Sequence, residues 1–156
     1  MHVAARSIAF LACVTAACAP AQASDARHLN PSGMPKTNGY SHVVNVPEAR
    51  HVIYVSGQLG IDANGKLAPD FRSEATQAFE NVRKALAAAG ADFKDVVRLN
   101  IYVTNMDAQM ITLREVRNRY IDMANPPAST ALEIKRLVVP TANVEIEVTA
   151  VLPDRS

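Results

Sequence analysis

Apolar and polar residues alternate strictly over residues 144–150, near the end of the chain. The apolar positions fall on one side of an extended strand, and Glu145 and Glu147 fall on the other. A second run with the same two-residue period covers residues 96–104. Strands of this kind have one face for a core and one for water or a partner, so the chain is expected to form a sheet covered on one side only.

A helical period predicts the cover for that sheet. After Pro69, Asp70 is placed to cap a helix whose apolar residues share one face, and Gly90 is placed to end it. The residues of that face are Ala75, Ala78, Phe79, Val82, Leu86 and Ala89. A second helix is expected from Asp107, as its cap, to Asn125-Pro126-Pro127, with Arg117 and Tyr120 on the same face as Leu113.

Three further segments have strand character. Residues 43–46 and 52–56 are rich in β-branched side chains and are expected to pair antiparallel across the turn at 47–50, and residues 129–137 are expected to form another strand. The resulting order is strand, strand, helix, strand, helix, strand, strand. This order predicts an α+β sandwich, in which two helices pack on one face of the sheet.

The N-terminus reads as a signal peptide. Arg6 precedes an apolar stretch, and Ala21-Gln22-Ala23 forms a small-residue cleavage site before Ser24. We expect a signal over residues 1–23, an irregular lead-in over 24–38 and one domain over 39–156, in a periplasmic or secreted protein. An alternative is a lipoprotein anchored through Cys18. The apolar stretch is shorter than the roughly 20 residues that a membrane-spanning helix needs, so no membrane span is expected.

Composition argues against several functional classes. Both cysteines lie in the signal, and His28, His42 and His51 are scattered, so we expect no metal site, no disulfide and no cysteine nucleophile. The formal net charge is +1 and no basic run is present, which argues against a nucleic-acid partner. No phosphate loop or serine-hydrolase elbow occurs, and we expect no cofactor.

Three segments together resemble the RidA/YjgF family, whose members hydrolyse enamines and imines released by amino-acid enzymes. They are Tyr54-Val55-Ser56-Gly57-Gln58, the run 126–133 and the run 144–148, and the resemblance extends from about Tyr40 to Leu152. It implies the chorismate-mutase-like sandwich with a mixed sheet. It also implies a homotrimer that binds a small-molecule ligand in clefts between its subunits.

The resemblance assigns provisional roles to several residues. Glu145 matches the glutamate that positions or activates the attacking water, and Ser56 and Gly57 match a turn where backbone approaches the ligand. Tyr40 matches a tyrosine at the rim of the cleft, and an equally open interpretation is a loop tyrosine at the edge of the core. Thr130 is a neutral donor beside the position of the signature arginine. Glu147 is expected to be a structural or interface residue.

The chain departs from the family pattern where the signature arginine would hold a substrate carboxylate, because that position is Ser129. A hydroxyl offers one neutral donor in place of a charged fork. Arg114 is a candidate to supply the missing charge, although Arg114, Arg117 and Arg119 on one helix are also typical of a solvated face. Two functions therefore remain open: an imine or enamine deaminase with altered or weak activity, and a non-catalytic homotrimer that binds a metabolite or a partner protein.

Overall fold

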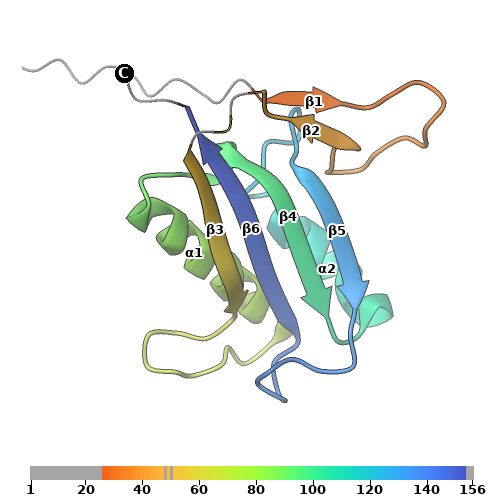
Figure 1. Ribbon diagram of the computed structural model, residues 1–156. Helices are drawn as coiled ribbons and strands as arrows, with labels where there is room; N and C mark the ends of the chain where they lie inside the picture. The colour runs from red at the N-terminus through yellow and green to blue at the C-terminus, as the bar shows by residue number, and fades with distance from the viewer. Residues whose placement is uncertain (1–25, 48, 50, 154–156) are drawn as a thin grey trace, which may run out of the picture.

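A four-stranded sheet forms the centre of the molecule (Figure 1). The structure is a computed structural model that describes residues 26–47, 49 and 51–153. The strand order is β3-β6-β4-β5, and β1 and β2 form a separate two-stranded sheet. In chain order the elements are β1 Arg27–Leu29, β2 Val43–Asn45, β3 His51–Leu59, α1 Phe71–Ala88, the 3-10 helix η1 Phe93–Asp95, β4 Val96–Val103, α2 Met106–Arg117, β5 Ala128–Glu133 and β6 Val144–Leu152.

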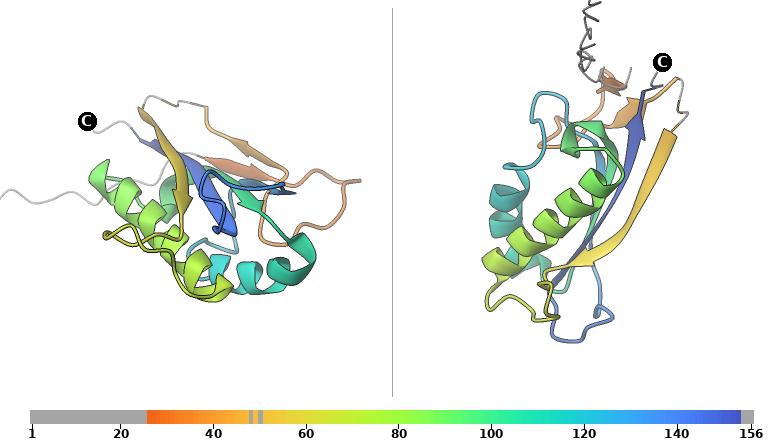
Figure 2. Two further views of the ribbon diagram at one scale, coloured as in Figure 1. Left: turned by 90° about the horizontal axis from the view of Figure 1, so that it is seen from below. Right: turned by 90° about the vertical axis from the view of Figure 1, so that its left-hand side faces the viewer.

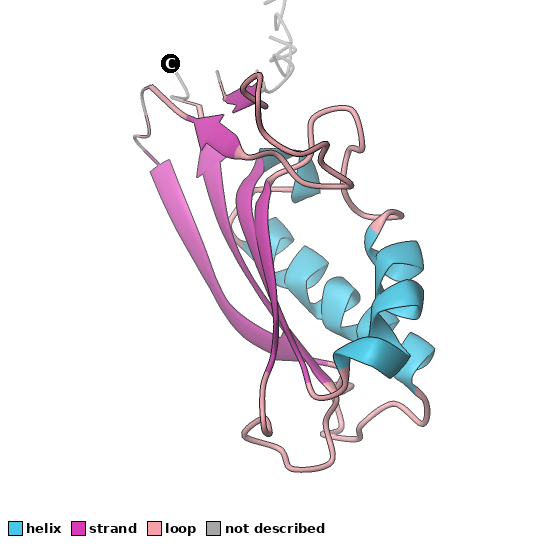
Figure 3. Cartoon of the chain, turned by 90° about the vertical axis from the view of Figure 1, so that its right-hand side faces the viewer, coloured by secondary structure: helices cyan, strands magenta, loops and turns pink. Residues whose placement is uncertain are grey.

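Both helices cover the same face of the sheet, as the two side views show (Figures 2 and 3). β4 pairs antiparallel with β6 and parallel with β5, and α2 forms the crossover between the two parallel strands. The sheet is therefore mixed, and the expected α+β sandwich with two helices on one face is confirmed. The face opposite the helices carries the polar positions of β4 and β6 and is not covered by any described element.

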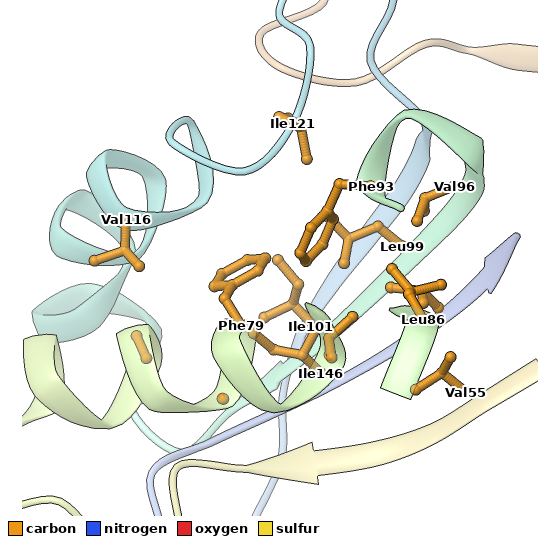
Figure 4. Packing of buried hydrophobic residues seen from close by; sticks show 14 of the residues in the cluster. Val55, Phe79, Leu86, Phe93, Val96, Leu99, Ile101, Val116, Ile121 and Ile146 are labelled. Carbon is orange, nitrogen blue, oxygen red and sulfur yellow. The ribbon is translucent and has the colours of Figure 1, made fainter. Parts of the chain in front are cut away.

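The core lies between the sheet and the helices (Figure 4). Leu99, Ile101 and Ile146 point from β4 and β6 toward Phe79 of α1, as the alternation in the sequence predicts. The rings of Phe79 and Tyr120 stack with their centroids 4.8 Å apart. Fully burying a side chain such as Phe79 contributes about 1.5–3 kcal/mol, so this layer holds the helices in place.

The first helix has the predicted ends. The Asp70 carboxylate accepts hydrogen bonds from the Ser73 backbone N–H at 3.0 Å and from its hydroxyl at 2.7 Å. Gly90 adopts a φ of 74°, which favours glycine, and follows the last helical turn. The second helix differs from its prediction: Asn105, not Asp107, caps it by accepting from Ala108 N–H, and it ends at Arg117 rather than near Asn125.

The edges of the sheets also differ from the predictions. β2 pairs with β1 and not with β3, and β1 itself lies in the segment 24–38, for which an irregular lead-in is expected. β3 pairs instead with β6, at the far end of the chain. β5 stops at Glu133, short of the expected 137, because the chain leaves the sheet to form the loop before β6.

The expected signal peptide, its cleavage site and Cys18 lie outside the described residues. Within the described part of the chain, no helix is both long and apolar enough to span a membrane.

Candidate functional site

Glu145 lies at a bulge between β3 and β6. The register shifts between Val55 and Gln58, so that Ser56 and Gly57 together oppose one residue of β6. The Glu145 side chain crosses the backbone at Gly57, where an added Cβ would overlap its Oε1 atom. Because only glycine leaves this space, the bulge brings a carboxylate and exposed backbone together on the open face of the sheet.

Glu147, the next residue on the same face, is already engaged. Its Oε1 accepts hydrogen bonds from Asn100 Nδ2 at 2.7 Å and from the Tyr102 hydroxyl at 3.0 Å. The bond to Glu147 is the main cause that raises the pKa of the Tyr102 phenol above its usual value. No hydrogen bond joins the Glu145 side chain to a described residue, which leaves its carboxylate available for a water or a ligand.

Ser129 and Thr130 lie on opposite sides of β5. Thr130 pairs with Asn100 on the open face, and its hydroxyl lies 3.4 Å from Arg98 Nη2. Ser129 pairs with Leu99, a core residue, so its side chain is directed to the helix side of this edge strand. The two neutral donors therefore do not serve the same surface of one chain.

Tyr40 lies beside the first residues of β5. The next residue, Ser41, is buried, pairs with Ala128 and donates hydrogen bonds to Pro127 O at 3.0 Å and Pro126 O at 2.7 Å. Tyr40 is half-buried and its ring meets the His42 ring edge-on, with centroids 5.5 Å apart. These contacts bring Tyr40 to the edge strand that carries Ser129.

The candidate residues thus form two separate groups. Tyr40 and Ser129 lie at the start of β5, whereas Gly57 and Glu145 lie near the start of β6, at the other end of the sheet (Figure 1). Ser129 and Glu145 are two strands and three register positions apart, about 14 Å between Cα atoms, and on opposite faces. One chain does not bring these two side chains into one site.

One of the three arginines expected on a solvated helix face is not exposed. Arg114 and Arg119 are exposed, but Arg117 is buried with 7% of its surface exposed. Arg114 has no hydrogen bond to Ser129, Thr130 or Glu145, and α2 lies on the helix side of the sheet. The signal for Arg117 was its helical spacing with Leu113, a core residue, which outweighed the usual exposure of arginine.

The described residues contain no group of three or more His, Cys, Asp or Glu side chains that could hold a metal ion.

Comparisons with known proteins agree with this architecture. Residues 32–152 match the family model described as Endoribonuclease L-PSP. The bovine protein named 2-iminobutanoate/2-iminopropanoate deaminase is 37% identical over 114 residues, which cover 72% of this chain and 79% of that protein. An Aquifex aeolicus RutC family protein is 34% identical, over 72% of this chain and 87% of its own length.

Solved structures show the same fold. A protein of unknown function of the Rid family from Yersinia pestis superposes with a TM-score of 0.76 and 31% identity, over 82% of this chain and 99% of that one. RidA from an Antarctic Psychrobacter species gives a TM-score of 0.62 and 30% identity, over 81% and 99% of the two chains. The protein therefore belongs to the RidA/YjgF family, the Endoribonuclease L-PSP group of proteins.

Proposed function

We propose that this protein hydrolyses imines or enamines to a carbonyl compound and ammonia, in a cleft between subunits of a homotrimer. The observation that carries the proposal is the free carboxylate of Glu145, positioned over the backbone of Gly57 at the β3 bulge. The names of several relatives, among them the bovine and mouse proteins, specify deamination of 2-imino acids. A hydrolase of this kind needs a carboxylate near the attacking water and needs no cofactor.

In the proposed reaction, Glu145 accepts a proton from a water molecule as the water oxygen bonds to the imine carbon. The C=N π electrons move to nitrogen, which takes that proton from Glu145 and gives a carbinolamine. Glu145 then accepts the hydroxyl proton of the carbinolamine and passes it to the nitrogen as the C=O bond forms and the C–N bond breaks. Ammonia leaves, and Glu145 ends in its starting ionisation state.

The positions of the candidate residues support a shared cleft. Because Ser129 and Glu145 lie about 14 Å apart on opposite faces, the second group must come from a neighbouring copy for both to contact one small molecule. The uncovered sheet face, with Tyr54 79% exposed, offers a surface for that copy. Tyr40, Ser56 and Ser129 then orient the substrate.

The second candidate function is a homotrimer that binds a metabolite or a partner protein without catalysis. Ser129 is the observation that favours it, because a single hydroxyl holds a carboxylate less strongly than an arginine fork. Thr130 is drawn toward Arg98 on the other face and does not compensate.

A side-by-side assay separates the two functions. The purified protein is given imines formed in place from several amino acids and from matched amines without a carboxylate, and ammonia release is followed. The hydrolase predicts turnover that Glu145→Gln abolishes. If no imine is cleared faster than in buffer, the non-catalytic function holds.

Export is a further part of the proposal, supported by the pattern of residues 1–23. The mature N-terminus should be Ser24, which intact-mass measurement of the protein from its native cell can show. A mass with diacylated Cys18 would support the lipoprotein alternative instead.

A further inference from the structure

Arg117 is the one buried positively charged side chain in the described part of the chain. It lies in the last turn of α2, on the same face as Leu113, which is fully buried. A guanidinium keeps its charge at any pH that a folded protein meets, so burial removes water from a permanent cation. Such a group normally has an anion beside it.

Arg117 has no such partner among the described residues. The Nε and Nη2 groups of Arg117 donate to Asn118 Oδ1 at 3.1 and 2.9 Å, and no carboxylate of the described chain forms an ion pair with it. Burial, and then the charge of Arg114, lower the pKa of Arg117. The amide of Asn118 orients the fork but supplies no negative charge.

Part of the guanidinium group nevertheless reaches the surface. Every fully buried side-chain nitrogen or oxygen of the described residues has a hydrogen-bond partner, and Nη1 of Arg117 has none. Nη1 is therefore not completely covered, although most of the side chain is.

Gly39 packs directly against this guanidinium. Its φ is 70°, and an added Cβ would overlap Nη2 of Arg117 and lie 3.3 Å from Nη1. The guanidinium thus rests on the Gly39 backbone, next to Tyr40. Ser41, two residues on, pairs with Ala128, the neighbour of Ser129. The guanidinium of Arg117 therefore lies against the segment that carries Tyr40 and reaches the start of β5.

We propose that Arg117 is an anion-binding residue that takes the carboxylate of a small-molecule ligand at the Tyr40 rim. The inference rests on the proposed function for the place of the cleft and for the substrate class, and it adds the residue that binds the substrate carboxylate. A ligand carboxylate supplies the missing counter-charge, and Asn118 holds the fork in the orientation that receives it. The charge that Ser129 lacks thus comes from α2, one turn beyond Arg114.

The test uses pyruvate, the stable product expected from 2-iminopropanoate, and its uncharged methyl ester. Binding of each to the purified oligomer is measured by ligand-observed NMR titration. Pyruvate should bind and the ester should bind at least about tenfold more weakly. Arg117→Gln should weaken pyruvate about ten- to a hundredfold and leave the ester unchanged, while Arg119→Gln, an exposed arginine of the same helix end, should change neither.

Arg117→Met is a second neutral variant for the case in which the glutamine variant does not fold, because an apolar side chain of similar length removes the buried charge. Equal binding of pyruvate and the ester, or full pyruvate affinity in either folded variant, would overturn the inference.

Glu145→Gln separates this result from the proposed reaction. Loss of turnover in this variant, with pyruvate binding retained, supports both the anion site and the hydrolase. Pyruvate binding that depends on Arg117 in a protein without turnover leaves the anion site standing and refutes the hydrolase.

Discussion

The carboxylate of Glu74 joins the first turn of α1 to the residue that precedes β6, Asn143. Its Oε1 accepts the Asn143 backbone N–H at 2.5 Å and that of Val144 at 3.2 Å, and its Oε2 accepts Asn143 Nδ2 at 2.9 Å. Glu74 is 1% exposed, so these bonds form away from water. They fix the start of the strand whose second residue is Glu145.

Glu74→Ala should lower the free energy of unfolding by about 3–5 kcal/mol, because it leaves buried backbone N–H groups without acceptors. Glu74→Gln keeps one oxygen and should cost less than half as much. Chemical denaturation of the two variants measures the difference. Replacement of Glu115, which is exposed and paired with Arg72, is the control and should cost no more than about 1 kcal/mol. Equal losses of unfolding free energy for Glu74→Ala and the control would show that the hydrogen bonds of Glu74 do not stabilise the fold.

Gly57→Ala should impair turnover far more than stability. The new methyl group displaces the flexible end of Glu145 rather than backbone, and a misplacement of about 1 Å can cost about a hundredfold in rate. Steady-state kinetics and thermal unfolding test the two effects separately. Added to Glu145→Gln, the same change should cause no further loss of rate. An additional loss in that double variant would show that Gly57 acts other than through Glu145.

Ser129→Arg should strengthen binding of carboxylate-bearing imines, since a hydrogen bond to a charged group contributes about 1.5–3 kcal/mol. The value of kcat/KM on amino-acid-derived imines should rise about tenfold or more, and Arg114→Asn in the same chain should add to the gain by removing a like charge. Ala131→Arg is the matched control, because Ala131 lies on the same face of β5 two residues further along. An equal gain from Ala131→Arg would point to non-specific attraction of anions.

Tyr54→Arg should weaken the proposed trimer without unfolding its subunits. Tyr54 lies on the uncovered sheet face, opposite Thr149, and is 79% exposed in the single chain. A charge there must be desolvated when a second copy covers the face. Sedimentation velocity at several concentrations should show dissociation. Val138→Arg, in an exposed loop, should leave the assembly intact. If the unmutated protein sediments as a monomer, the shared-cleft proposal fails.

The sequence by itself determined the layers of this protein. Period-two alternation in β4 and β6 and the apolar face of α1 are local patterns, and they decide which side chains face the core wherever those elements are placed. Asp70 and Gly90 end α1 through contacts within a few residues. The position of Glu145 on the polar face followed from the same alternation.

Tertiary structure decided everything that depends on which elements meet. β2 paired with β1 rather than with β3, and β3 paired with β6, almost a hundred residues away. Register decided that Ser129 and not Thr130 faces the helices, and it separated Ser129 from Glu145. Helical spacing with Leu113 indicated that Arg117 lies on the core-facing side of α2, but its burial also needed the Gly39 segment to pack against the guanidinium. The solvent exposure of a side chain depends on such distant neighbours as well as on its place in the helix.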